Sequence, residues 1–292
     1  MRGLYFHDSK SRGDITDMAD IEIACHTAAW GDDGFINALA DIEKAGFKCI
    51  ETTTGVVEQF EDRVEVFNEI LSQHHMHLVG ITAGGAVWPG SSLEEEVERS
   101  LNIVRFLKSA DAKFLTLLAP RPNPDNPMEE EEDLMPVATA YGEIARRTQE
   151  MGILPCLHPD SGSHVYDVKR LEKFLEFSDP AAMKLCVDTS FLNQAGLPMA
   201  RFIKDNKKRI GVVHLRDIKP LPKKKKKGDP GPNFLTVELG KGTINLENFV
   251  DTLLAVEFSG WATVELEKGP RPLLQQAIAS HQYAAQTLDL VL

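Results

Sequence analysis

Two histidines, an aspartate and a glutamate each stand at the end of a short apolar run that is typical of a buried β-strand. The runs are ILPCLHPD, KLCVDTS, GVVHLRD and WATVELE, and the four residues are His158, Asp188, His214 and Glu265. Imidazole nitrogens and carboxylate oxygens together bind divalent transition metals. Such a set would hold one ion and leave positions open for a substrate. The residue types therefore predict a metal-dependent enzyme, with Mn²⁺ as the expected ion and Zn²⁺, Co²⁺, Fe²⁺ or Mg²⁺ as alternatives.

These four runs are the last of eight strand-type runs that alternate with amphipathic stretches such as GFINALADIEKAG and SLEEEVERSLNIVRFLKSA. The predicted strands cover residues 21–27, 47–53, 77–83, 113–119, 153–159, 183–189, 209–215 and 261–267. Eight alternating βα units predict the α/β class and a single (β/α)8 TIM barrel with a parallel eight-stranded core. The alternative is an open doubly wound sheet, but no GxGxxG motif follows the first strand.

The length of 292 residues suits one barrel domain over residues 21–292, preceded by a flexible arm over residues 1–20. Met18 is an alternative start. No apolar run approaches the ~20 residues that cross a bilayer, and the first residues lack a secretory signal. We therefore expect a cytoplasmic protein without a membrane partner; a homo-oligomer stays open.

The net charge limits which kinds of binding partner we expect, and the spacing of the cysteines indicates their redox state. The formal net charge is −12, whereas a protein that binds a duplex needs a cationic surface, so we expect no nucleic-acid partner. One local exception is the lysine run 223–227, whose alternatives are a solvated loop and attraction for an anionic substrate. The four cysteines form no CxxC pair and are interpreted as reduced thiols.

Alternation along a strand predicts two layers inside the barrel. Cysteines precede Glu51, His158 and Asp188 by two residues, so each pair shares a strand face. We expect the thiols to fill the barrel core and the polar groups to lie one layer higher, at the mouth.

Other residues near predicted strand ends are candidates for contact with a substrate, because barrel active sites lie at the carboxyl ends of the strands. Glu51, near the end of the second strand, is a candidate acid or base, and the alternative is a buried hydrogen-bonded carboxylate.

Three further candidates lie near the ends of the last two strands. Arg216 could make forked contacts with a substrate oxygen, and Asp217 could orient a metal ligand. Glu265 and Glu267 share a strand face; we favour Glu265 as the ligand. The candidate substrate-binding residues are His26, Trp30, Trp88, Asp160, Arg216 and Glu267, although Trp30 and Trp88 are equally interpreted as loop anchors.

The segments HPDSGS, CVDTSFLNQAG, VVHLRDIK and LGKGTINLENFVDTLLAVEFSGWATVELEKGP resemble the xylose isomerase-like TIM-barrel superfamily over about residues 21–290. This superfamily includes sugar isomerases and epimerases, inosose dehydratases and endonuclease IV. The resemblance implies metal ligation by His158, Asp188, His214 and Glu265. HPDSGS is closest to the HPHxGT signature of the inosose dehydratase branch, in which a histidine stands where many isomerases place a glutamate.

The chain departs from the family pattern at several positions. Phe191 and Val212 stand where many members have histidines, Arg216 replaces a lysine, and Asp160 replaces the second histidine of HPHxGT. These losses argue against the multi-zinc site of an endonuclease IV-type nuclease. They also keep open a barrel that binds sugars without catalysis.

The function that we expect is a divalent-metal-dependent isomerase or epimerase of a sugar or sugar phosphate, acting through an enediolate intermediate. Glu265, or another residue at the mouth such as Glu51, would remove the proton beside a carbonyl as a general base. The alternative is an inosose dehydratase-type lyase that expels a β-hydroxyl from a keto-cyclitol or keto-sugar. In each case the substrate is a small carbohydrate or cyclitol.

Overall fold

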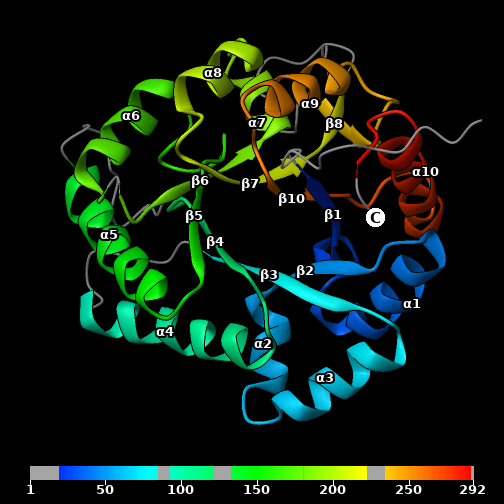
Figure 1. Ribbon diagram of the computed structural model, residues 1–292, viewed down its shortest axis with the longest axis horizontal. Helices are drawn as coiled ribbons and strands as arrows, with labels where there is room; N and C mark the ends of the chain where they lie inside the picture. The colour runs from blue at the N-terminus through cyan, green and yellow to red at the C-terminus, as the bar shows by residue number, and fades with distance from the viewer. Residues whose placement is uncertain (1–19, 85–92, 122–132, 180, 222–233, 291–292) are drawn as a thin grey trace, which may run out of the picture.

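The computed structural model describes residues 20–84, 93–121, 133–179, 181–221 and 234–290. Within these ranges eight parallel strands close into a barrel in the order β1-β10-β7-β6-β5-β4-β3-β2, and helices surround it (Figure 1). The predicted TIM barrel is thereby confirmed. No helix in the described part of the chain is both long enough and apolar enough to span a bilayer.

Each barrel strand falls within a predicted range or differs from it by one residue. The barrel strands are β1 (Ile21–His26), β2 (Cys49–Thr53), β3 (His77–Ala83), β4 (Phe114–Leu118), β5 (Leu154–His158), β6 (Lys184–Asp188), β7 (Ile210–Leu215) and β10 (Gly260–Val264). The last strand ends before Glu265, whereas the apolar pattern predicted that it would run to residue 267. Glu265 is still held beside β7, because its backbone N–H donates to the carbonyl of Leu215 at 3.1 Å.

The helices are α1 (Phe35–Ala45), α2 (Thr54–Phe60), α3 (Val64–Gln73), α4 (Leu93–Ser109), α5 (Leu134–Glu150), α6 (Val168–Phe177), α7 (Thr189–Gln194), α8 (Met199–Asn206), α9 (Leu246–Ala255) and α10 (Leu273–Gln286), with short 3₁₀ turns η1 (Thr27–Trp30) and η2 (Asp32–Gly34). Helix α1 ends as its sequence predicts, since Gly46 takes a left-handed conformation with φ of 104° at the C-cap. Helices α10 and α1 pack together and close the outer ring.

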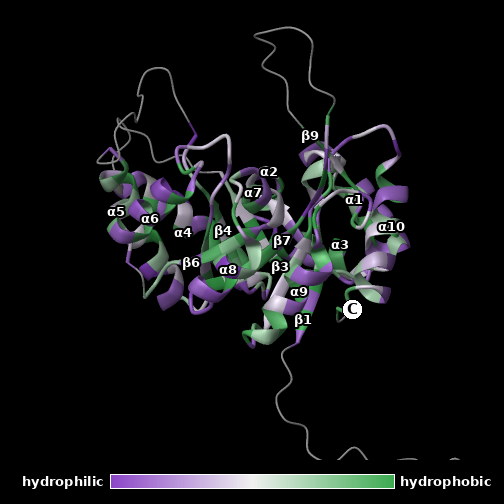
Figure 2. Cartoon of the chain, turned by 90° about the horizontal axis from the view of Figure 1, so that it is seen from above, coloured by the Kyte–Doolittle hydropathy of each residue, from purple (hydrophilic) through white to green (hydrophobic). Residues whose placement is uncertain are grey.

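A two-stranded antiparallel hairpin of β8 (Asp217–Pro220) and β9 (Phe234–Val237) was not predicted. It follows β7 and stands at one end of the barrel, where β9 projects beyond the helices (Figure 2). The sequence predicts a loop here, because two strands of four residues each are too short to give an apolar pattern. The lysine run 223–227 and Trp88 lie outside the described residues.

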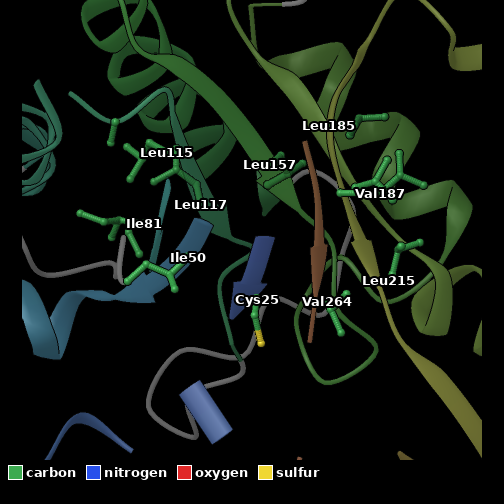
Figure 3. Packing of buried hydrophobic residues seen from close by; sticks show 14 of the residues in the cluster. Cys25, Ile50, Ile81, Leu115, Leu117, Leu157, Leu185, Val187, Leu215 and Val264 are labelled. Atoms are coloured by element: carbon green, nitrogen blue, oxygen red, sulfur yellow. The ribbon is translucent and has the colours of Figure 1, made fainter. Parts of the chain in front are cut away.

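The barrel strands are buried on both faces, as expected for a parallel sheet with helices outside. Figure 3 shows the outward-facing layer, in which residues such as Cys25, Ile50, Leu157 and Val264 pack beneath the helices. The inward layer below the mouth comprises Ala24, Val79, Phe114, Cys156, Cys186 and Val212, with Cys49 packed against it. The thiols of Cys156 and Cys186 therefore fill the barrel core, as the alternation predicted. Burial raises the pKa of the Cys186 thiol to about 12, so it is held as a neutral thiol.

Candidate active site

The four predicted metal ligands converge at the carboxyl end of the barrel. His158, Asp188, His214 and Glu265 each offer one ligand atom, and these four atoms lie within 4.8 Å of one another. Asp188 and His214 are paired directly across the β6–β7 ladder. The alternation of the strands explains the arrangement, since the outward-facing Leu157, Val187, Leu215 and Val264 are sequence neighbours of the four inward-facing groups (Figure 3).

The surroundings of Asp188 fit a cation. Its Oδ1 accepts the backbone N–H of Phe191 at 2.8 Å, which caps helix α7. Its Oδ2 is buried and has no hydrogen-bond partner among the described residues. His158 Nε2 lies 3.5 Å and Arg216 Nη1 3.6 Å from that oxygen. Two groups that bind one ion at ~2.0–2.2 Å each are separated by about this much, so the donor set fits a divalent metal.

The charge state of Asp188 suits the same role. Burial raises the pKa of this carboxyl, but its contact with His158 and the charge of Arg216 outweigh burial and lower the pKa to about 2. Asp188 is therefore an anion near neutral pH, as a metal ligand must be.

His214 is enclosed by two carboxylates. Its Nδ1 lies 3.1 Å from Glu265 Oε2, and its Nε2 lies 2.9 Å from Glu51 Oε2. Burial alone lowers the pKa of His214, but its acidic surroundings raise it well above the ordinary value. Burial raises the pKa of Glu265, but the charge of Arg216 and the contact with His214 outweigh burial and hold this pKa well below its ordinary value. The carboxyl of Glu265 is therefore ionised.

The ligands form the floor of a cavity of about 440 Å³. Four of the predicted substrate-binding residues line it: His26, Asp160, Arg216 and Glu267. Glu267 pairs with Arg216 and is about half exposed, whereas Glu265 is 19% exposed and belongs to the ligand group. The geometry thus separates the two glutamates that the strand pattern left as alternatives.

Arg216 is held firmly in this cavity. Its backbone N–H donates to Thr189 Oγ1 at 2.9 Å, and the Thr189 hydroxyl donates to the carbonyl of Arg216 at 2.6 Å. Burial lowers the pKa of Arg216, but the carboxylates of Glu265, Asp188 and Glu267 raise it overall. The guanidinium is therefore a fixed cation beside the ligand group.

His26 lines the cavity, but both of its ring nitrogens are already engaged. Its Nδ1 accepts the backbone N–H of Ala28 at 3.1 Å, and its Nε2 lies 3.0 Å from Thr82 Oγ1. Since a backbone N–H can only donate, the ring proton resides on Nε2. Burial lowers the pKa of His26, which keeps the ring neutral. A substrate can therefore contact the carbon edge or the face of the His26 ring, but not its nitrogens, which bond to protein groups.

Three other sequence candidates lie away from the cavity. The indole N–H of Trp30 donates to Asp41 Oδ2 on α1 at 2.9 Å, which anchors the turn after β1. Glu51 is fully buried and does not line the cavity. Asp217 accepts backbone N–H groups of Ile218, Gly242 and Ile244, so it holds the GKGTI turn instead of orienting a ligand.

Thr82, Arg121 and Phe234 also line the cavity and were not among the predicted site residues. Thr82 carried a usable signal, because it is a polar residue one position before the end of β3, as His214 is on β7. Phe234 carried none, since it enters from the unpredicted hairpin.

Comparison with known proteins places these observations in a family. The family model described as xylose isomerase-like TIM barrel matches residues 39–287. An inosose dehydratase of Mesomycoplasma hyopneumoniae (strain 7448) is 24% identical over 260 residues, which is 82% of this chain and 84% of that protein.

Two solved structures have the same fold. The D-psicose 3-epimerase of Clostridium cellulolyticum H10, solved with D-tagatose, superposes with a TM-score of 0.72 at 13% identity, covering 92% of this chain and 99% of that one. The IolI protein with a bound zinc atom has a TM-score of 0.69 at 14% identity, covering 92% and 98%. With a family model that spans most of the barrel, the chain belongs to the xylose isomerase-like TIM barrel family.

Proposed function

We propose that this protein is a divalent-metal-dependent enzyme that removes a proton beside the carbonyl of a keto-cyclitol or keto-sugar and expels a β-hydroxyl as water. His158, Asp188, His214 and Glu265 would hold the ion. When bound, the ion would polarise the substrate carbonyl as a Lewis acid. The coverage of the inosose dehydratase by this chain supports this class of substrate.

The observation that carries the choice of reaction is the pairing of one ionised glutamate, Glu265, with a histidine across the site. Glu265 belongs to the ligand group, lines the cavity and is 19% exposed, whereas the other carboxylate of the group, Asp188, is buried. Epimerisation removes a proton from one face of a carbon and returns it to the other, which needs a proton carrier on both sides. Elimination of water on one face needs a single group, which takes the proton from carbon and passes it to the leaving hydroxyl. His158 as a metal ligand has no proton to give from its ligating nitrogen, so elimination would use Glu265 alone, whereas epimerisation would need Asp160 as a second proton carrier.

Isomerisation is the second candidate, since moving a proton along one face of an enediolate also needs a single base. Epimerisation needs a further acid, for which Asp160 is available among the described residues, because its carboxylate lines the same cavity and is 24% exposed. Arg216 would orient a hydroxyl or the carbonyl of the substrate in either reaction.

The charges of the cavity support a neutral substrate. It is lined by four carboxylates (Asp160, Asp188, Glu265 and Glu267) and two arginines (Arg121 and Arg216). Within the described part of the chain, one divalent ion would neutralise the remaining negative charge and leave no excess of positive charge for a phosphate. A polyhydroxylated ketone without a phosphate fits this balance.

The test is to incubate the full chain, loaded with Mn²⁺, with 2-keto-inositol and separately with a panel of ketoses. We expect an ultraviolet-absorbing enone from the keto-cyclitol, lost in Glu265→Gln and retained in Asp160→Asn. Interconversion of ketoses without enone would favour the isomerase, and its loss in Asp160→Asn would favour the epimerase. No turnover of either substrate class by the metal-loaded protein would contradict the proposal.

A further inference from the structure

A continuous chain of hydrogen bonds runs through the buried side of the site, on three of the four barrel strands that supply no proposed metal ligand. It links His26 of β1, Glu51 of β2 and Thr82 of β3 to His214 of β7. The distances are 3.0 Å from His26 Nε2 to Thr82 Oγ1, 2.6 Å from Thr82 Oγ1 to Glu51 Oε1, and 2.9 Å from Glu51 Oε2 to His214 Nε2.

The donor and acceptor of each hydrogen bond in this series follow from the first bond, whose donor is a backbone N–H. The backbone N–H of Ala28 donates to His26 Nδ1, so His26 donates from Nε2 to the Thr82 oxygen. The Thr82 hydroxyl then donates its own proton to Glu51 Oε1. Glu51 Oε2 is left to accept from Nε2–H of His214. His214 thereby holds one proton on Nε2, and Nδ1, which donates to the ionised Glu265 while no ion is bound, is the nitrogen that faces the ligand group and would give up its proton to an ion.

We propose that Glu51 is a positioning residue that fixes the ring orientation and tautomer of His214, so that Nδ1 is presented to the metal. This inference rests on the proposed function, because it assigns Glu51 a role at the same site. Ligating histidines commonly donate their second N–H to a carboxylate, which raises ligand basicity.

The burial of Glu51 and its hydrogen bonds argue for a positioning role and against a role as catalytic acid or base. Glu51 has an exposed fraction of 0%, both of its oxygens are engaged, and it does not line the cavity. Glu51 therefore acts on a substrate only through the cavity-lining residues to which it bonds, His214 and Thr82. A buried charge is also a poor stabiliser of a fold, since an apolar side chain of similar size often serves stability equally well. Its presence here is explained by its contact with His214.

The chain offers a matched control. Thr52, the next residue along β2, is also fully buried, and its Oγ1 lies 2.7 Å from Thr27 Oγ1. Thr82→Val and Thr52→Val each delete one hydroxyl that bonds to a neighbouring side chain, although Thr82 is only partly buried. The Thr82 hydroxyl belongs to the chain that ends on His214, whereas the Thr52 hydroxyl contacts that of Thr27.

The experiment measures Mn²⁺ and Co²⁺ binding by titration calorimetry for the wild-type chain, Glu51→Gln, Thr82→Val and Thr52→Val, with urea unfolding in parallel. We expect Glu51→Gln to weaken binding by about 10–100-fold, the range for such outer contacts, and Thr82→Val to weaken it by less. Thr52→Val, at the more buried site, should lose at least as much stability as Thr82→Val with an unchanged Kd. Equal Kd values for the wild type and Glu51→Gln, or for the two threonine variants, would overturn the inference.

A second readout needs no metal. In protein with ¹⁵N-labelled histidine, a ring N–H that bonds to buried Glu51 should exchange slowly with solvent, and this signal should be lost in Glu51→Ala. If the wild type binds neither ion, the proposed function and the role of Glu51 toward an ion both fail. If the wild type binds and Glu51→Gln binds equally well, the inference alone fails and the proposed function stands.

Discussion

Two glutamates bond to opposite nitrogens of His214, and they come from opposite halves of the barrel mouth. Glu51 of β2 has an exposed fraction of 0%, whereas Glu265, after β10, is 19% exposed and faces the cavity. Both are ionised, because charged or hydrogen-bonding partners lower the pKa of each against the effect of burial; for Glu51 the pKa is about 2. The same residue type therefore serves two purposes, and access to the cavity is what separates them.

The comparison extends to the two halves as wholes. The half made of β5, β6, β7 and β10 presents its polar groups to the cavity as ligand atoms. The half made of β1, β2 and β3 directs His26, Glu51 and Thr82 toward one another, and only at the end toward His214. In the proposed function, one half of the rim would bind the ion, and the other half would hold a ligand of that ion in place.

The largest effect should come from the binding half. Asp188→Ala removes an anionic ligand, so we expect Mn²⁺ affinity to fall by more than the ~10–100-fold that outer contacts cost. Titration calorimetry measures this loss, with Asp160→Asn as a control that lines the cavity outside the ligand group. If Asp188→Ala kept its affinity, the division of the rim into two halves would be wrong.

The next effect is that of pH on metal affinity. Without metal, the acidic surroundings of His214 raise its pKa well above the ordinary value despite burial. An ion must displace that proton, so affinity should rise by about tenfold per pH unit below the raised pKa, with release of about one proton per ion. Calorimetry in two buffers of different ionisation enthalpy counts the protons. Binding without proton release would contradict the assignment of His214 as a ligand.

Arg216→Lys should have a smaller effect, on substrate and not on metal. It keeps the positive charge but loses the fork that contacts several oxygens at once. Loss of one charge-assisted hydrogen bond, ~1.5–3 kcal/mol, predicts a rise in KM of about tenfold or more. Steady-state kinetics separates KM from kcat, and Mn²⁺ affinity should stay within a factor of a few. An unchanged KM would place Arg216 outside substrate binding.

The smallest effect is expected for Trp30→Phe, in the supporting half. This change deletes the N–H that donates to Asp41, which lies on α1. A single hydrogen bond predicts a loss of about 0.5–1.5 kcal/mol in the free energy of unfolding. Urea unfolding measures that loss, while Mn²⁺ affinity and KM should not change. A large rise in KM would contradict this assignment and would indicate that Trp30 contributes to substrate binding.

The sequence predicted more of the half of the rim formed by β5, β6, β7 and β10 than of the half formed by β1, β2 and β3. His158, Asp188 and His214 each stand at or next to the end of a strand whose apolar pattern is strong, and the closed barrel brings strand ends together. Thr82 stands next to the end of β3 in the same way, but its importance depends on the side chains to which it bonds, His26 and Glu51. The hairpin that carries Phe234 was missed because short strands leave too few residues for a pattern.

By itself, the sequence determined the fold class, the strands and the four residues that gather at one end of the barrel, because alternation and helix periodicity are local properties of the chain. Only the tertiary structure decided which of those groups face the cavity and which are sealed beneath it. Glu51 and Glu265 illustrate the reason: each follows a strand pattern that looks alike in one dimension. Hydrogen bonding and exposure depend on neighbours that are distant in sequence, and the closure of the barrel alone brings those neighbours together.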